Sequence, residues 1–381
     1  MSTFADAIAR IRIATWAEDD ETVAGLREAA LSWGPDAGKV ADAALALDRG
    51  QTDEAVAFLN QAHILQHEAR DEASRLRAEA LLEGGRPADA LMILEGMPGD
   101  GAATSKARAL FRLRRADDAV AVLDEVLSRD PDHWEARLGR AVLHLSQGQV
   151  EAAMPMLEKL RGDQPLDPRP YRALAKVFLL TGDAVKGASF LELLLENQLI
   201  ASPAIAIDLA ELYAVSGQTD RLPTVLESVT RAAKVGTKQA IELARLWQEV
   251  PSSGAIRHLA QAMGERPVSA LLNALAVEVE GGDALEAFQA VSGVDHWLVH
   301  ERLAAHLLAA ERPDDAEPHV AQAQKMAPRT AAVRITVAVA ALHTDASTAT
   351  DQLRAAAAHP SLRASERRRA QRALAAIDAV H

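Results

Sequence analysis

The 381-residue sequence contains no cysteine, few aromatic residues and no long uninterrupted hydrophobic run. Without cysteine the protein cannot form disulfides, iron–sulfur clusters or thiolate zinc sites, and it has no cysteine nucleophile. Aromatic residues are 3% of the sequence, and because strands favour aromatic and β-branched residues, a mainly β fold is excluded. No apolar segment reaches the roughly 18 residues of a membrane-spanning helix, so we expect no membrane insertion.

The sequence also lacks a surplus of positive charge. Its formal net charge is −13, which disfavours nucleic acid as a partner because phosphate contacts need a positive surface. Residues Met1 to Trp16 do not show the charged-then-apolar order of a signal peptide. Together with the absence of cysteine, this predicts a cytoplasmic protein.

The sequence is rich in alanine and contains internal repeats. The sequence holds about 80 alanines, and alanine is the strongest helix former. A 34-residue interval separates Ala107, Ala141 and Ala175. The same interval separates Ala119, Ala153 and Gly187; Leu123, Leu157 and Leu191; Pro131 and Pro165; and Gly148 and Gly182. Such a fixed period predicts a stack of equivalent structural units.

Each unit is predicted to contain two helices. In residues 168–199, the first helix is indicated by apolar residues at helical spacing, namely Tyr171, Leu174, Ala175 and Phe178. Gly182 follows as a turn residue that adopts positive φ without strain. The second helix presents Gly187, Leu191, Leu194 and Leu195.

This order of aromatic, leucine, small residue, aromatic and glycine, followed by small and large apolar positions and a closing proline, resembles the tetratricopeptide repeat. The resemblance implies a right-handed superhelix of antiparallel helix pairs whose first helices line a concave, peptide-binding groove. Physical reasoning agrees, because one amphipathic hairpin cannot bury both faces and needs its neighbours.

Extending the phase predicts an all-α, right-handed superhelical α-solenoid of about eleven antiparallel hairpins with a capping helix at 361–380. The motif is strong in 103–235, moderate in 36–98 and 295–328, and weak elsewhere. We therefore expect an N-terminal array, 1–236, and a degenerate helical-repeat region, 237–381. The breakers at 250–254 and 281–282 fit either a bend into two lobes or degenerate repeats within one solenoid.

Charge is segregated between the two predicted helix types. The first helices (102–115, 134–147 and 169–180) carry ten bases and one acid, whereas the second helices (117–129, 149–161 and 183–196) carry four bases and nine acids. If the first helices line a groove, as the resemblance implies, that groove suits carboxylates. The predicted groove residues are Arg108, Arg112, Arg137, Arg140, Arg169, Arg172 and Lys176. The alternative is that arginines complement the C-terminal end of a helix dipole, which fits Arg112 but not Arg137 or Arg169.

Three residues at helical spacing raise a metal-site hypothesis. His63 and His67 are four apart and Asp71 continues the row, a set that could ligate zinc on one helical face. No glutamate of the zinc-protease motif lies between the histidines. His296 and His300 repeat the spacing, and twelve histidines make such pairs easy to obtain by chance. We expect neither a metal nor a cofactor, and no nucleophile-elbow, P-loop or dinucleotide-binding motif is present.

The leading functional hypothesis is a non-enzymatic scaffold or adaptor that binds a partner protein, or its acidic segment or C-terminus, through the groove. A regulatory or assembly subunit of an enzyme complex in envelope, polysaccharide or secretion machinery is the alternative. An enzyme on a helical solenoid is a third hypothesis. The basic face of the final helix (Arg363, Arg367, Arg368, Arg369 and Arg372) is expected to be solvated, with an acidic partner as the alternative. No pattern predicts the oligomeric state.

Overall fold

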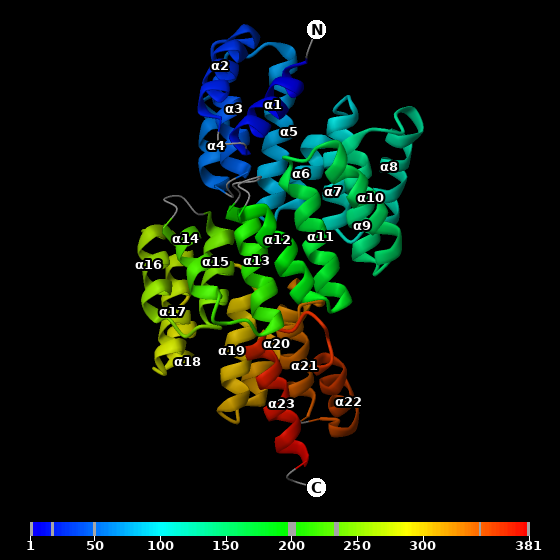
Figure 1. Cartoon of the computed structure of the whole chain (residues 1–381). Coiled ribbons are helices and arrows are strands. Elements are labelled where there is room, and N and C mark those ends of the chain that lie inside the picture. Colours follow the sequence, from blue (N-terminus) through cyan, green and yellow to red (C-terminus); the bar gives the residue numbers. More distant parts are fainter. Residues whose placement is uncertain are drawn as a thin grey trace. The chain divides into compact units, whose positions relative to one another are not determined.

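The computed structural model describes residues 3–16, 19–48, 51–196, 203–231, 236–342 and 344–378, and every regular element in these ranges is a helix (Figure 1). The helices are α1 (Phe4–Trp16), α2 (Asp20–Ala30), the 3-10 helix η1 (Leu31–Trp33), α3 (Ala37–Asp48), α4 (Thr52–Gln61), α5 (His67–Glu83), α6 (Pro87–Leu94), α7 (Asp100–Arg112), α8 (Ala116–Arg129), α9 (Trp134–Ser146), α10 (Val150–Asp163), α11 (Pro168–Thr181), α12 (Ala184–Glu196), α13 (Pro203–Ser216), α14 (Leu222–Arg231), α15 (Thr237–Trp247), α16 (Ser253–Met263), α17 (Val268–Glu280), α18 (Ala284–Gln289), α19 (Trp297–Ala309), α20 (Pro313–Met326), α21 (Ala331–Ala341), α22 (Ala346–Ala357) and α23 (Ala364–Asp378).

The helices follow one another as hairpins. Taken in sequence order, α1 to α22 form successive pairs, and α23 follows the last pair. Partners such as α3 and α4, α7 and α8, and α19 and α20 pack together, and the first helices of neighbouring hairpins also touch, as α3 does with α5 and α5 with α7. The predicted all-α stack of about eleven hairpins with an additional final helix is confirmed.

Contacts divide the protein into two compact units, which are described separately. Unit 1 comprises Met1–Leu180, Ser189–Asp208 and Lys234–Thr237, and unit 2 comprises Thr181–Ala188, Leu209–Ala233 and Lys238–His381. The expected division at 236/237 concerned the regularity of the repeat motif, and it stays a prediction. The breakers at 250–254 and 281–282 fall at the turns between α15 and α16 and between α17 and α18.

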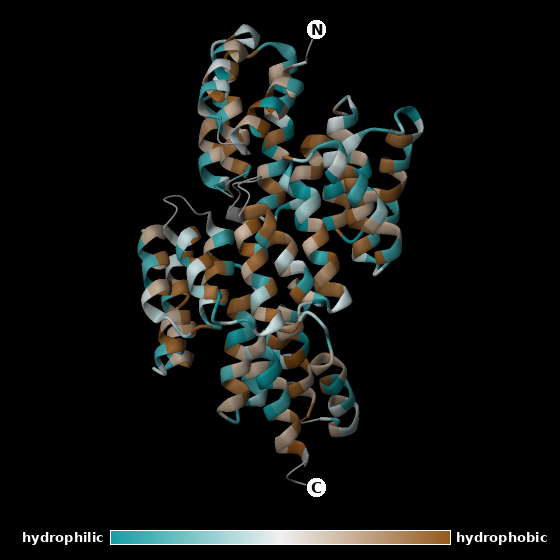
Figure 2. Cartoon of the chain, viewed as in Figure 1, coloured by the Kyte–Doolittle hydropathy of each residue, from teal (hydrophilic) through white to brown (hydrophobic). Residues whose placement is uncertain are grey.

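The alanines and leucines that keep the 34-residue period form the core. Ala107, Ala141, Ala119 and Ala153 are buried, as are the large residues of the same phase, Leu123, Leu157 and Leu191. Figure 2 shows hydrophobic and hydrophilic residues alternating around the same helices, as expected for amphipathic hairpins. Where α9 crosses α8, a Cβ at Gly139 would lie 3.0 Å from a Leu123 methyl carbon, so the small residue permits the close approach.

The turn within a hairpin requires a residue in the left-handed region. Gly182 has φ +80°, which confirms its predicted role, and Gly148 and Gly217 do the same in their hairpins. Two hairpins place ordinary residues there instead. Arg114 has φ 65° between α7 and α8, and Glu311 has φ 57° between α19 and α20. Both positions are strained, because the left-handed region costs a residue with a Cβ about 1–2 kcal/mol.

Replacing either residue by glycine is expected to stabilise the protein. Arg114→Gly and Glu311→Gly should each raise the free energy of unfolding by about 0.5–1 kcal/mol, since relief of strain exceeds the extra entropy of glycine in the unfolded state. Urea unfolding followed by circular dichroism measures the change. The control is Arg115→Gly, whose φ is −98° and which should not gain stability. A loss of stability in both turn variants would contradict the assignment of strain.

No helix among the described residues has both the length and the apolar character needed to cross a membrane.

Candidate partner-binding surface

The first helices of successive hairpins in unit 1 form one continuous face, here called the A-helix face of unit 1. It is made by α1, α3, α5, α7 and α9, which touch in order, and by α11, the first helix of the next hairpin. Asp48 on α3 feels the charge of Arg169 on α11. Helices about 10 Å apart in a straight row would put α3 and α11 about 40 Å apart, beyond the reach of a screened charge. The face therefore curves between α3 and α11, as expected for a superhelix of hairpins.

Two of the predicted groove residues, Arg108 and Arg112, lie on α7 and pair with acids of α5. Arg108 donates hydrogen bonds to Glu79 and Glu83, each at 3.3 Å. Arg112 lies 3.8 Å from Glu83. Both arginine side chains are 46% exposed, so they remain accessible from solvent while their charge is partly compensated.

Arg137 and Arg140 lie on α9 and join it to the helices on either side. Arg137 is 3.4 Å from Asp163 on α10, and Arg140 is 3.1 Å from Asp124 on α8. Their side chains are 11% and 22% exposed. Arg137 therefore ties the two helices of its own hairpin, Arg140 ties that hairpin to the preceding one, and both offer little surface to a partner.

Arg169, at the start of α11, is held in place by its neighbours. Its guanidinium group donates to both carboxylate oxygens of the buried Asp167, at 2.6–3.0 Å, and it stacks 4.5 Å above the Trp134 ring. Glu135 lies 3.8 Å away. The aromatic face and the two-pronged ion pair fix the guanidinium in one orientation.

The next two cations on α11 differ from one another. Arg172 donates a 2.6 Å hydrogen bond to Asp208 on α13. Lys176, one turn later, is exposed and makes no ion pair with any residue in the described ranges. Of the seven predicted groove residues, Lys176 is thus the one whose charge no described carboxylate neutralises directly.

The charges on this face are more balanced than the charge segregation predicted. The compensating acids Glu79, Glu83 and Asp208 lie on helices outside the three compared in the sequence, and Asp167 lies in the turn before α11. The relevant signal was present in the sequence as the acidic residues of 67–83. A partner carboxylate must therefore compete with the protein's own carboxylates, except at Lys176.

Asp48 and Glu79 form the interior part of this network. Arg12 on α1 lies 3.1 Å from Asp48 and 3.8 Å from Glu79, but within the described residues the Arg12 Nε and Asp48 Oδ2 atoms have no hydrogen-bond partner. Burial raises the pKa of Asp48 to about 6, against the attraction of Arg12 and with the help of Glu79. For Glu79, burial is outweighed by Arg12, Arg108 and Arg75, which hold its pKa well below its usual range.

The predicted histidine row is only partly assembled. His67 opens α5 and its ring lies 3.2 Å from Asp71. His63 lies in the loop before α5, where its backbone N–H donates to Asp36, so the expectation that it shares a helical face with His67 is wrong. The reason is local, since Asp36 binds the backbone of 63 and 64 and closes the loop. Across the described ranges, no group of three or more His, Asp or Glu side chains is placed to hold a metal.

The second histidine pair is also separated. His296 caps α19 by accepting from the Leu298 N–H, whereas His300 lies inside α19 with its Nδ1 3.0 Å from Nδ1 of His319 on α20. Burial lowers the pKa of His296 to about 4, which leaves it neutral near pH 7 and able to accept that hydrogen bond.

In unit 2 the final helix is not only a cap. Arg368 and Arg372 are exposed, as expected, but the expectation of a solvated basic face is wrong for Arg363, which is 4% exposed. Arg363 donates to Glu211 of α13 at 3.0 and 2.5 Å and to Glu242 of α15 at 3.3 Å. These pairs draw the arginine inward, because the acids lie on first helices of unit 2.

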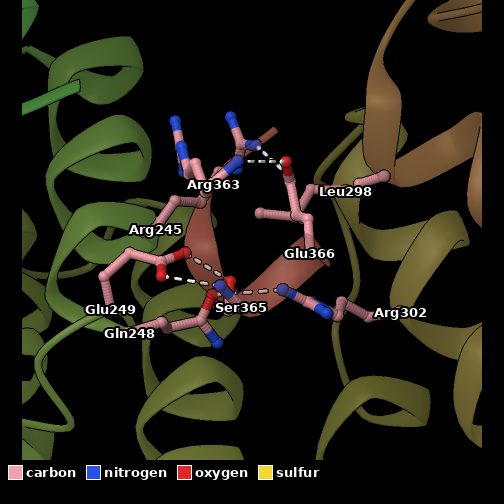
Figure 3. Close-up of a pocket in the computed structure, with 9 residues that line it drawn as sticks. Arg245, Gln248, Glu249, Leu298, Arg302, Arg363, Ser365 and Glu366 are labelled. Atoms are coloured by element: carbon pink, nitrogen blue, oxygen red, sulfur yellow. Dashed lines mark hydrogen bonds and ion pairs between the residues drawn. The ribbon is translucent and has the colours of Figure 1, made fainter. Parts of the chain in front are cut away.

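Figure 3 shows the neighbouring side chains of α23 pointing toward α15 and α19. Ser365 donates its backbone N–H, at 2.9 Å, and its hydroxyl to Glu249. Glu366 accepts from Arg245, which stacks 4.9 Å from the Trp297 ring. Sequence reasoning missed this surface because the partners lie more than a hundred residues apart in the sequence.

A family model for the tetratricopeptide repeat matches residues 110–177. This segment runs from the end of α7, through α8, α9 and α10, into α11. Residues 110–177 thus resemble tetratricopeptide repeats. They contain Arg112, Arg137, Arg140, Arg169, Arg172 and Lys176, so six of the seven predicted groove residues lie within them.

No curated protein matches the sequence. Solved structures similar to this protein include the APC/C hetero-tetramer Cut9–Hcn1, at 13% identity, covering 100% of this protein and 85% of that one with a TM-score of 0.45. Others are an IFIT1 monomeric mutant with Gppp-AAAA, at 13% identity, 100% and 91% coverage and a TM-score of 0.47, and the human IFIT1 dimer with PPP-AAAA, at 15% identity, 98% and 90% coverage and a TM-score of 0.45. At such identities and scores they bear on neither the partner nor the chemistry of this protein.

Proposed function

We propose that the protein is a non-enzymatic scaffold that binds a partner protein through the A-helix face of unit 1. The observation that carries the proposal is the coincidence of the tetratricopeptide repeats at 110–177 with a curved face bearing accessible cations. Stacked hairpins present a long rigid surface, so the protein loses little conformational entropy when it binds a partner segment. A cytoplasmic location is part of the same proposal.

The partner segment is proposed to be acidic, either an internal stretch or the C-terminal end of the partner. Arg108, Arg112 and Arg172 are about half exposed, and Lys176 has no carboxylate partner in the described part of unit 1. Guanidinium groups bind carboxylates through paired hydrogen bonds, and lysine adds a point charge. The internal acids make the site selective, because a ligand must offer better-placed carboxylates than the protein itself.

Charge reversal on α11 tests this proposal. The double variant Arg172→Glu/Lys176→Glu should bind a fluorescein-labelled acidic peptide with a free C-terminal carboxylate at least tenfold more weakly than the wild type, because two attractions become repulsions. Fluorescence polarisation at low and physiological salt gives the affinities. The matched control is Lys159→Glu on α10, a second helix, which makes the same kind of charge change off the A-helix face.

The same three proteins can be used as bait for affinity capture with mass spectrometry. Acidic proteins captured by the wild type and by Lys159→Glu should be lost from the double variant. Equal capture and equal peptide affinity in all three would reject the A-helix face of unit 1 as the binding surface.

A further inference from the structure

The A-helix face of unit 2 carries a helix across it. This face is formed by the first helices α15, α17, α19 and α21, together with the part of α13 that belongs to unit 2. Helix α23 packs on α21 and α22 (Figure 1). Arg363, the residue before it, reaches α13 and α15, and Arg369 reaches α19. Arg363 and α23 together thus contact acids from three other first helices.

The two halves of α23 are held by different forces. The beginning is ionic, with Arg363 on Glu211 and Glu242 and Arg369 on Glu301. The later part is apolar, since Ala370 is fully buried against α21 and α22, with Leu374 packed beside it. A segment that fits this face therefore carries two arginines six residues apart, followed by an apolar turn.

Without α23 the face would be strongly acidic. Glu301 is fully buried, and its Oε1 atom lies 2.8 Å from Arg369. Glu211 and Glu242 would lose Arg363, and Glu249 would lose Ser365. Glu242 would keep Arg245 and Glu301 would keep Thr336, but a buried carboxylate that loses an arginine is costly. A segment that replaces α23 must therefore place guanidinium groups beside the same carboxylates, so it must contain arginines.

We propose that the A-helix face of unit 2 is a binding site for an arginine-bearing helix of a partner protein, and that α23 is a built-in occupant which such a helix displaces. The site differs from the one proposed in unit 1, since it is acidic and selects basic segments. Residues 358–363 join α23 to α22, and this tether keeps α23 at a high effective concentration. A partner therefore binds only when its helix adds contacts beyond those that α23 makes.

A second copy of the protein is a poorer occupant. Exchange of α23 between two copies would replace every contact by an identical one and would add none from the helix itself, whereas a partner helix with extra contacts gains affinity.

The test uses the full-length protein and a labelled synthetic peptide of residues 361–378. The variant Arg363→Ala/Arg369→Ala weakens the built-in helix while leaving the acids of the face intact. It should bind the peptide at least tenfold more tightly than the wild type, and the gain should shrink as salt rises. The matched control, Arg368→Ala/Arg372→Ala, alters two exposed arginines of the same helix and should bind as weakly as the wild type. A peptide in which the arginines at 363 and 369 are replaced should bind neither the wild type nor either variant.

A gain of affinity in the Arg363→Ala/Arg369→Ala variant alone supports the proposal. If that variant keeps the far-UV circular dichroism of the wild type but gains no affinity, the proposal is overturned. If its affinity gain comes with stable dimers in light scattering, the occupant is a second copy and a partner helix is rejected.

A second measurement uses the wild type, so the proposal can still be tested if the Arg363→Ala/Arg369→Ala variant fails to fold. Excess unlabelled peptide should speed hydrogen exchange of the protein's own residues 364–378 at least several-fold, because displaced helices lose their protected amides. The arginine-free peptide should not. Unchanged exchange at saturating peptide would show that α23 is a fixed structural helix and would overturn the proposal.

Discussion

The variant Arg369→Met is expected to lower the free energy of unfolding by about 3 kcal/mol, the lower end of the range for breaking a buried ion pair. The reason is the burial of Glu301, which is 0% exposed and accepts from Thr336 besides pairing with Arg369. Removing the arginine leaves this carboxylate with Arg302, whose Nε atom lies 3.7 Å away and does not hydrogen-bond to it. Methionine replaces the apolar stem of the arginine and leaves out the guanidinium group.

Two further variants separate the ion pair from simple loss of packing. Arg368→Met changes the exposed neighbour and should alter stability by less than about 0.5 kcal/mol. The double variant Glu301→Met/Arg369→Met removes both charges and should recover most of the loss, since replacing a whole buried pair by apolar groups is often neutral. Urea unfolding followed by circular dichroism gives all three values. A loss in Arg368→Met as large as that in Arg369→Met would contradict the argument.

The ion pair between Glu301 and Arg369 also predicts that the free energy of unfolding falls in acid. Burial raises the pKa of Glu301, but Arg369, Arg302 and the Thr336 hydrogen bond outweigh it and hold the pKa at about 2. The folded state therefore binds this proton less tightly than the unfolded state does. The stabilisation is complete above the usual glutamate pKa of 4.5 and is lost as the pH falls toward 2.

The hairpins were predictable because they depend on local pattern. Ala107, Ala141 and Leu157 recur at a fixed interval and are all buried, and Gly182 adopts the positive φ that its place in the pattern implies. Each hairpin is covered by its immediate neighbours, so the information needed lies within about two repeats.

The charges were less predictable because ion pairs join helices that lie far apart in sequence. Arg108 was placed correctly in a first helix, but its partner Glu79 is 29 residues earlier. Arg172 pairs with Asp208, 36 residues later. Counting charges within three hairpins could not include the acids that flank them, so the net charge of the face was overestimated.

The role of α23 was the hardest to predict. The arginines of this segment are indistinguishable in sequence from solvated ones, although Arg363, just before α23, is buried and Arg368 within it is exposed. Glu211, the partner of Arg363, is 152 residues away. The two meet through tertiary contacts within unit 2, which the repeat period does not specify.

Asp48 on the A-helix face of unit 1 leads to the second large effect, in which removal of a charge stabilises the protein. Burial and the nearby Glu79 raise its pKa to about 6, against a usual value of 3.8. Arg12 lies close but is not aligned for a hydrogen bond, so it offsets only part of the cost of burying the carboxylate.

The sign of the pH dependence follows from the raised pKa. Between pH 4 and 6 the folded state binds the Asp48 proton more tightly than the unfolded state does, so this residue makes stability fall as the pH rises through that window. Above pH 6 the cost is constant. A shift of this size corresponds to about 3 kcal/mol at most.

Asp48→Asn keeps the shape of the side chain and removes the charge. At pH 7 it should raise the free energy of unfolding by about 2–3 kcal/mol, and the advantage over the wild type should shrink toward zero as the pH is lowered to 4. Urea unfolding at pH 4, 5, 6 and 7 and constant ionic strength measures the difference. The control Asp118→Asn breaks an exposed pair with Arg115 and should change stability by less than about 1 kcal/mol at every pH. If Asp48→Asn is instead less stable than the wild type at pH 7, attraction to Arg12 outweighs burial, and Asp48 stabilises unit 1 as an ordinary ion pair.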